Sequence, residues 1–262
     1  MPNDYINDII IFISGISSGL FISIAPGTAS VILIPVFTLL LGASIYNVIG
    51  TSLLIDCIIG LVAGLIFLFR KRVDFQPIIY LGASGVITSI IGSRFTRIAP
   101  ESNLMAVLGI FLFVIGLNFL INGIQKNLDY INKKIAFRFF RKYRKTSFVI
   151  LGMIIGFLSG FMGMGSAGIV AIVLVLVFEY EIHTGIGTSL LMMSFIAGAG
   201  GISHTFKGEI LPNPLIIAGL GAVIGSFSGA LFANKIDEEK LGKIIGLIIV
   251  VFGFVLIFKA FF

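Results

Sequence analysis

The five residues GTSLL occur twice, in VIGTSLLIDC (48–57) and in GIGTSLLMMS (185–194). Both copies lie in strongly apolar segments, and they are separated by 137 positions. The same shift aligns residues 50–116 with 187–253 without a gap. Identical pairs include residue types that shared apolar composition does not explain: Pro77 with Pro214, Gly82 with Gly219, Gly92 with Gly229, and Glu101 with Glu238. This pattern predicts two homologous halves.

The composition is that of a membrane protein. Hydrophobic residues make up 58% of the chain, charged residues 11%, and the mean hydropathy is +1.14, whereas a soluble domain carries about 25% charged residues. Between Asp8 and Arg70 the only charged side chain is Asp56, and this run is far longer than the roughly 20 residues that span a bilayer. Because open strands cannot satisfy their backbone groups in lipid, we predict an all-α integral membrane protein that crosses the membrane several times.

Charged and turn-rich positions divide the chain into ten apolar segments. These are 9–24, 28–44, 47–69, 77–97, 103–123, 148–164, 167–180, 184–205, 213–234 and 240–261. The predicted organisation is a first membrane repeat (1–125), a basic linker (126–146) and a second membrane repeat (147–262).

The basic linker holds eight Lys or Arg residues and one Asp, a charge of +7, so the rest of the chain is close to neutral against the net charge of +6. Beside membrane spans, the positive-inside rule explains such a cluster as a cytoplasmic loop, so nucleic-acid binding is not expected. The helical spacing of Leu128, Ile131, Ile135 and Phe139 favours a short amphipathic helix on the membrane surface. The N-terminal sequence MPNDYINDII has no Lys or Arg, which argues against a cleaved secretory signal and favours an N-terminus outside the cytoplasm.

Each half begins with an interrupted apolar segment. Residues 9–44 would form a helix of about 54 Å, too long for one crossing, and SIAPGTAS (23–30) interrupts them. The counterpart in the second half is GMGSAGIV (163–170). Pro and clustered Gly break helices, so we expect a broken or re-entrant helix pair plus three transmembrane helices in each half. If the pair enters and returns, the repeats are inverted, which we favour; if it crosses once, they are parallel.

Broken helices in inverted repeats are typical of secondary transporters. A helix N-terminus inside the membrane offers free N–H groups and the positive end of the helix dipole, and both favour an anion. The second half reads GFLSGFMGMGSAG (156–168), followed later by His204 and Gly208. Together with the repeated GTSLL, these motifs resemble the TauE/SafE sulfite exporter family, also called 4-toluene sulfonate uptake permeases. The resemblance implies passage of small sulfur-containing anions, such as sulfite or organosulfonates, across the bacterial inner membrane.

The chain departs from the family pattern in places. That pattern is Gly-x-Gly-Gly-Gly, followed by an apolar run with a Pro. The second half reads Gly163-Met-Gly165-Ser-Ala-Gly168 and lacks the Pro, whereas the first half keeps Pro35. These departures bear on the substrate more than on the family.

Candidate substrate-binding residues are the small and hydroxyl-bearing residues at the breaks and in GTSLL, together with one histidine. They are Gly27, Thr28, Ser30, Thr51, Ser52, Gly163, Gly165, Ser166, Gly168, Thr188, Ser189 and His204. The alternative is that the hydroxyls bond to the carbonyl one turn back or join neighbouring helices. For His204 the alternative is placement at the membrane interface. Arg94 and Arg97 either extend to the interface or attract anions to an entrance.

Asp56 lies near the middle of its span, where an ionisable side chain is a functional candidate. Its aligned residue is Met193. We interpret Asp56 as a proton-coupling residue; a hydrogen-bonded structural role is the alternative.

The sequence lacks the motifs of several enzyme classes. There is no G-x-x-x-x-G-K-[ST], G-x-S-x-G or H-E-x-x-H motif, and the single Cys57 excludes a disulfide framework. Metal ligation by Glu179, Glu181 and His183 is not favoured. We therefore expect no cofactor and no enzymatic activity, but a secondary transporter for a small anion that works by alternating access. The alternatives are a passive anion channel, an intramembrane enzyme and an assembly factor; direction and oligomeric state stay open.

Overall fold

The computed structural model describes residues 2–98, 136–163 and 165–233, together with Pro100 and scattered positions within 102–120 and 243–258. All secondary structure in this part of the chain is helical. The elements are α1 (Pro2–Ile24), α2 (Ser30–Leu40), α3 (Ile45–Phe69), α4 (Phe75–Pro77), η1 (Ile78–Gly82), α5 (Ala83–Phe95), η2 (Thr96–Ile98), α7 (Ala136–Lys142), α8 (Arg144–Met162), α9 (Ala167–Ile172), η3 (Val173–Val177), α10 (Ile182–Phe206) and α11 (Pro212–Ala233).

Six of the described helical segments are long and apolar enough to cross a membrane, which confirms the predicted class. The expected segments 103–123 and 240–261, and most of the expected amphipathic helix in the basic linker, lie outside the described residues. The expected breaks are present, between α1 and α2 and between α8 and α9.

The repeat is visible in the element boundaries. Helices α3 and α10 each have 25 residues, and the 137-residue shift superimposes both of their ends. The next spans, Phe75–Ile98 and Pro212–Ala233, also begin at aligned positions. The aligned sequences therefore form corresponding helices.

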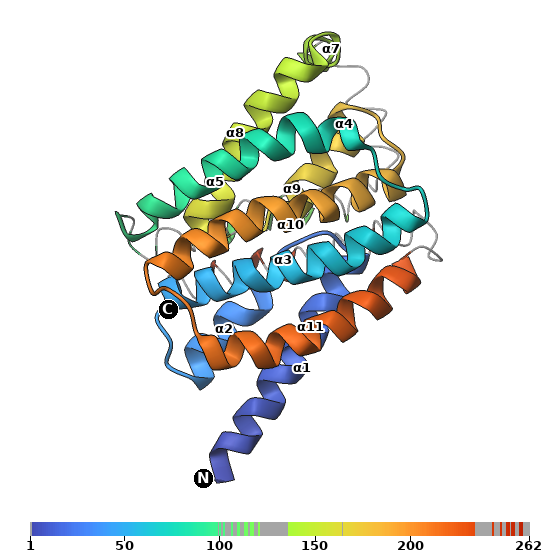
Figure 1. Cartoon of the computed structure of the whole chain (residues 1–262). Coiled ribbons are helices and arrows are strands. Elements are labelled where there is room, and N and C mark those ends of the chain that lie inside the picture. The colour runs from blue at the N-terminus through green and yellow to red at the C-terminus, as the bar shows by residue number, and fades with distance from the viewer. Residues whose placement is uncertain are drawn as a thin grey trace.

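Helices α3 and α10 lie side by side at the centre of the molecule and run antiparallel (Figure 1). A Cβ atom built on Gly50, near the start of α3, would lie 2.0 Å from the carbonyl oxygen of Glu209 beyond the end of α10. One built on Gly187, near the start of α10, would lie 2.3 Å from that of Arg72. Glycine thus allows close approach at both ends of the pair, at aligned positions.

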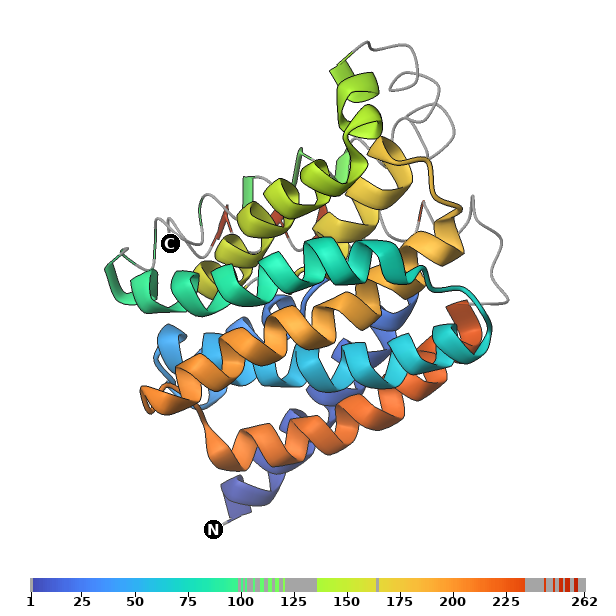
Figure 2. The same cartoon turned by 45° about the horizontal axis from the view of Figure 1, so that its top comes forward.

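The outer helix pairs combine elements of different halves. Helix α1 packs along α11, and α8 packs along α5 (Figure 2). Both contacts depend on glycine: a Cβ atom on Gly15 would lie 2.1 Å from the carbonyl oxygen of Ala218, and one on Gly160 would lie 1.9 Å from that of Ser89. In both pairs, the first helix of one half therefore packs against a helix from the end of the described part of the other half.

Both breaks follow from local backbone chemistry. Helix α1 ends before Pro26, which has no N–H to continue the hydrogen-bond ladder. Helix α8 ends at Gly163, whose φ of +69° is the left-handed conformation that favours glycine at a helix C-terminus. The Gly163 N–H caps the helix by donating to the carbonyl oxygen of Ser159 at 2.9 Å.

After the second break the chain runs back to the end of the molecule at which α8 begins. The rings of Phe148, near the start of α8, and Phe178, after η3, are 4.4 Å apart. Arg141 Nε also donates to the carbonyl oxygen of Val177 at 2.7 Å. Helices α8 and α9–η3 therefore form a helical hairpin whose tip includes Gly163, Gly165 and Ser166.

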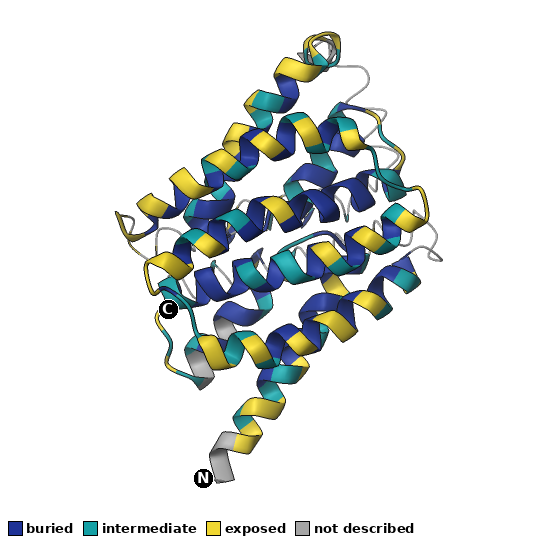
Figure 3. Ribbon diagram, viewed as in Figure 1, coloured by how far each residue is buried: buried dark blue, intermediate teal, exposed yellow. Residues whose placement is uncertain are grey.

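Burial separates the central helices from the outer ones (Figure 3). The apolar window of α10 is 83% buried, whereas the windows of α1, α5, α8 and α11 are at most 44% buried. Exposed residues of the outer helices are largely apolar, for example Ile87, Ile154 and Ile224. This is the arrangement expected of a core surrounded by lipid-facing helices.

The threonines of the two GTSLL motifs each bind a backbone N–H from the other half. Thr51 Oγ1 accepts the N–H of Leu211 at 2.8 Å, and Thr188 Oγ1 accepts the N–H of Asp74 at 2.9 Å. The two acceptors are aligned by the repeat, and so are the two donors. Thr51 thus holds the residue that precedes α11 in the second half, and Thr188 holds the residue that precedes α4 in the first half.

We expect Thr51→Val to lower the free energy of unfolding by about 1–3 kcal/mol, because the partly buried N–H of Leu211 loses its acceptor. Thermal unfolding in detergent measures the loss. Thr205→Val is the matched control, since the Thr205 hydroxyl donates only to the carbonyl of Gly201 in its own helix. Equal shifts for both variants would contradict this role of Thr51.

Candidate functional site

The two helix breaks meet beside Asp56, in the middle of α3. The Asp56 side chain is fully buried. Its Oδ1 accepts the N–H of Ala29 at 2.7 Å, and its Oδ2 accepts the Thr28 hydroxyl at 2.8 Å. The carboxyl group therefore caps the N-terminal end of α2, where a negative charge is favoured by the helix dipole.

Hydroxyl groups join the first break to the second. Ser30 Oγ lies 2.7 Å from Ser52 Oγ and also donates to the carbonyl oxygen of Gly163. Ser52 in turn donates to the carbonyl of Ile49, one turn back in α3. The Gly163 carbonyl, left without an intrahelical partner at the end of α8, is thereby satisfied.

Glycines let the second break approach the first. A Cβ atom on Gly165 would lie 2.5 Å from Asp56 Oδ2 and 3.0 Å from Thr28 Cβ. One on Gly168 would lie 2.9 Å from the carbonyl oxygen of Pro26. We call this meeting point of residues 25–30, Gly163, 165–168 and Asp56 the tip junction.

Several buried hydroxyls on the helices of the tip junction have no hydrogen-bond partner within the described part of the chain. They are Ser18 and Ser23 of α1, Ser159 of α8 and Ser166 at the second break. Ser18 and Ser159 are aligned with each other in GISSG (15–19) and GFLSG (156–160). A buried hydroxyl without a partner costs free energy, so these groups are available to a ligand or to water.

His204 lies in a second polar cluster, near the end of α10. Its Nδ1 is 2.6 Å from Glu209 Oε2, and its Nε2 is 3.2 Å from the carbonyl oxygen of Gly160. Arg97 Nε is 2.6 Å from Glu209 Oε1, and Lys207 Nζ is 3.5 Å from Glu209 Oε2. Glu209 is thus a buried carboxylate with three basic neighbours.

Opposing effects act on the pKa of Glu209. Burial by itself raises it, but the hydrogen bond from His204 and the charges of Lys207, His204 and Arg97 outweigh burial, so the pKa lies below its ordinary value. The ion cluster therefore stabilises the fold at neutral pH, and this contribution is lost as the pH falls through the lowered pKa of the folded protein.

Glu209→Gln is expected to lower the melting temperature at pH 7, because the charged hydrogen bond to His204 and the ion pair with Arg97 weaken together. The loss corresponds to about 1–3 kcal/mol. The difference in melting temperature between Glu209→Gln and the unchanged protein should become smaller below about pH 4.5, where glutamate in the unfolded chain becomes protonated. Thermal melts from pH 3.5 to pH 7 measure this. Glu179→Gln, which changes a half-exposed ion pair with Arg141, should have little effect on the melting temperature. A loss of melting temperature for Glu209→Gln that is the same at every pH would contradict the account.

The structure brings most of the predicted substrate-binding residues together and separates others. Those at the tip junction and its immediate contacts are Gly27, Thr28, Ser30, Ser52, Gly163, Gly165, Ser166 and Gly168, with Asp56. Thr51 and Thr188 bind backbone groups near opposite ends of the central helix pair. Ser189 donates to the carbonyl of Ile186 in its own helix. His204 belongs to the Glu209 cluster.

Sequence reasoning missed Glu209 and three of the four unpaired serines, Ser18, Ser23 and Ser159, whereas it included Ser166. The signal for Ser18 and Ser159 was present in their alignment within the repeat. Glu209 is an acid five residues after His204 in a chain with few acids, but nothing in the sequence shows that its side chain turns inward. No cluster of three or more His, Cys, Asp or Glu suited to a metal ion occurs among the described residues.

Comparisons with known proteins agree with this architecture. Over 172 residues the chain is 24% identical to the probable membrane transporter protein YunE of Bacillus subtilis (strain 168), covering 62% of each protein. Over 62 residues it is 40% identical to the probable membrane transporter protein YdhB of the same organism, covering 24% of this chain and 25% of YdhB. The matches thus span less than two thirds of either relative. No solved structure matches the chain significantly.

A family match covers nearly the whole chain. The model of the family "Sulfite exporter TauE/SafE" matches residues 11–256, which include both helix breaks, both GTSLL motifs and the Glu209 cluster. With six membrane-capable helices among the described residues, this identifies a multi-pass membrane protein, located in bacteria in the inner membrane. The chain belongs to the sulfite exporter TauE/SafE family of membrane transporters.

Proposed function

We propose that this protein is a secondary transporter for a small anion, a sulfur oxyanion such as sulfite or an organosulfonate, and that the anion binds at the tip junction. The observation that carries the proposal is the meeting of two helix breaks beside a buried carboxyl group. Backbone groups at such breaks inside a membrane are tolerated where protein or a ligand satisfies them. The family supplies the class of substrate.

The two breaks differ in charge, and an external anion would complement the second. In the first half, Asp56 accepts the N–H at the start of α2. In the second half, the residue aligned with Asp56 is Met193, which offers no charge. The apolar helix Ala167–Val177 therefore begins without a carboxylate from that position, next to the unpaired Ser166 hydroxyl. An anion there would take the place that Asp56 occupies in the other half.

Asp56 is the proposed proton-coupling residue. Its two accepted hydrogen bonds favour the charged carboxylate, whereas its complete burial favours the protonated form. These opposing effects, together with its contact to the second break through Gly165, make its charge sensitive to an anion bound nearby. Protonation would weaken its hold on α2 and would favour entry of the anion.

We infer that the two halves form inverted repeats, which alternate access by moving against each other. The antiparallel course of the homologous helices α3 and α10 supports this inference. The hairpin of α8 and α9–η3 in the second half supports it further, because a pair that returns to its starting end leaves the three expected transmembrane helices, an odd number, to cross the membrane. The basic linker then lies on the cytoplasmic side.

Uptake into proteoliposomes tests the proposed function. Labelled sulfite, sulfate, thiosulfate and sulfonates are compared with and without a pH gradient. A carrier shows saturable uptake and accelerated exchange when the substrate is also present inside the vesicle. A passive channel shows neither, and an enzyme or an assembly factor shows no flux. Absence of uptake for all four anions would contradict the proposal.

A further inference from the structure

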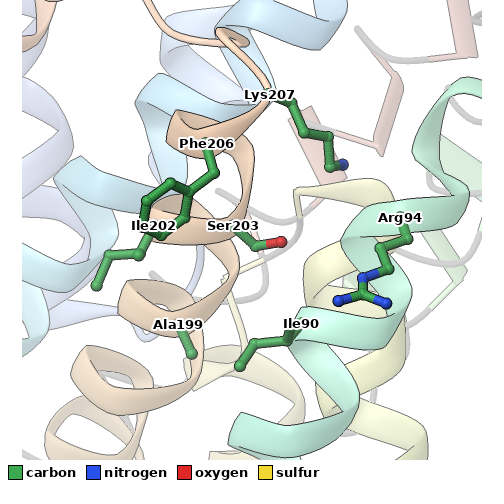
Figure 4. A pocket seen from close by; sticks show the side chains of 7 residues that line it. All are labelled: Ile90, Arg94, Ala199, Ile202, Ser203, Phe206 and Lys207. Carbon is green, nitrogen blue, oxygen red and sulfur yellow. The ribbon is translucent and has the colours of Figure 1, made fainter.

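A pocket of about 600 Å³ opens between α5 and α10, at the end of the molecule where both helices end. Its volume is in the range of small-molecule binding sites. The lining residues are Ile90, Arg94, Ala199, Ile202, Ser203, Phe206 and Lys207. Figure 4 shows Arg94 and Lys207 extending into the space between the helices, with the Ser203 hydroxyl on the same side.

The polar part of the pocket carries excess positive charge. Arg94 is exposed and makes no hydrogen bond or ion pair with any residue that the structure describes. Lys207 donates to the carbonyl oxygen of Ser93 and lies 3.5 Å from Glu209. The Glu209 carboxylate also pairs with Arg97. Its single negative charge therefore does not balance the three positive charges of Arg94, Arg97 and Lys207. An anionic group is the complementary ligand.

The apolar part of the pocket faces outward from the helix bundle. Phe206 is 88% exposed and Ile202 is 54% exposed, on a helix that otherwise is largely buried. Arg94 lies in the last turn of α5, and Lys207 follows the last residue of α10. Cations at the ends of membrane spans lie at the level of the lipid headgroups. A ligand here has an anionic head at that level and an apolar body along Ile202 and Phe206.

The positive charge of this pocket does not recur at the aligned positions of the other half. The positions of α11 aligned with Ile90 and Arg94 are Phe227 and Leu231, both apolar. The corresponding surface in the other half thus has no cation from its third helix. The guanidinium group is a feature of the α5–α10 pocket alone.

We propose that this pocket binds an anionic phospholipid, with the phosphate held by Arg94, Lys207 and the Ser203 hydroxyl and an acyl chain against Ile202 and Phe206. The pocket is separate from the tip junction, and its ligand does not depend on the transported anion. Lipid is preferred to a soluble anion because the apolar wall is open to the membrane. The expected specificity is for the charge of the headgroup.

The absence of Trp from the chain allows a direct test with a single introduced fluorophore. Phe206→Trp is reconstituted with phosphatidylglycerol or phosphatidylcholine brominated on the acyl chains, diluted into unbrominated phosphatidylcholine. We expect half-maximal quenching at a mole fraction of phosphatidylglycerol several-fold lower than that of phosphatidylcholine. Phe227→Trp, on the lipid-facing side of α11 without a neighbouring Arg94, should show no such preference.

Two further variants assign the preference to the pocket. Arg94→Gln in the Phe206→Trp background should abolish it, whereas Arg70→Gln, which removes an exposed arginine at the other end of the molecule, should leave it unchanged. Equal quenching by both lipids, or a preference that survives Arg94→Gln, would overturn the proposal. Release of quenching by 4-toluenesulfonate in solution would also overturn it, because the pocket would then hold a soluble anion.

Discussion

Asp56→Ala is expected to lower the initial rate of sulfite uptake by at least about 30-fold in proteoliposomes with equal amounts of inserted protein. The substitution leaves the Ala29 N–H without an acceptor in a buried place. It also removes the nearest acceptor of the Thr28 hydroxyl, which keeps only its longer contacts to Ser30 Oγ and the Gly163 carbonyl oxygen. A buried donor without a partner costs about 1–3 kcal/mol, and about 2 kcal/mol is enough for this factor. The first helix break should lose its defined position, and the anion site should be lost with it.

Asp56→Asn separates the structural role from proton coupling. An asparagine keeps an oxygen for the Ala29 N–H and an amide that can donate to Thr28 Oγ1, but it cannot take up or release a proton. We expect substrate exchange to persist while the response of net uptake to a pH gradient disappears. If net uptake by Asp56→Asn still responds to a pH gradient, Asp56 is not the coupling residue, whatever the effect of Asp56→Ala.

The second large effect is expected for Gly165→Ala, which should lower uptake by about tenfold or more. The added Cβ atom would lie 2.5 Å from Asp56 Oδ2 and 3.0 Å from Thr28 Cβ. Neither neighbour can move without breaking a hydrogen bond at the tip junction. Forced overpacking costs about 1–3 kcal/mol, and about 1.4 kcal/mol corresponds to a factor of ten.

Gly27→Ala is the matched control, because it adds the same methyl group at the other break. The nearest atom to that Cβ would be the carbonyl oxygen of Ala25 at 3.6 Å, an ordinary van der Waals contact. We expect near-normal uptake for this variant. Equal losses for both alanine variants would show that the breaks tolerate no side chain at all, and that the contact of Gly165 with Asp56 has no special weight.

The broken helices could be predicted because their causes are local. Pro26 lacks a donor, and Gly163 adopts a left-handed conformation, so each break is determined by residues at the break itself. The correspondence of α3 and α10 was likewise readable from the repeated GTSLL and its constant shift. Hydrophobicity gave the spans directly, since burial in lipid selects for apolar residues along a whole helix.

The partners of polar groups could not be predicted, because they depend on contacts between distant segments. The carboxyl group of Asp56 binds a residue 27 positions away, and Thr51 binds one 160 positions away. The sequence favoured the tip junction as a site, but it did not separate Thr51, which fixes a connection, from Ser52, which reaches the first break. Only the tertiary arrangement makes that distinction.

The central claim is that the tip junction holds the anion and opens in turn to each side of the membrane. The direct measurement is labelling of Ser166→Cys, in a Cys57→Ser background, by a membrane-impermeant thiol reagent that carries a fixed positive charge, applied from one side at a time. Ser166 is fully buried in this structure, so labelling reports opening. We predict labelling from either side, slowed in both cases by 4-toluenesulfonate, which does not react with the reagent. Labelling from one side only, or at a rate that 4-toluenesulfonate does not change, would contradict the account.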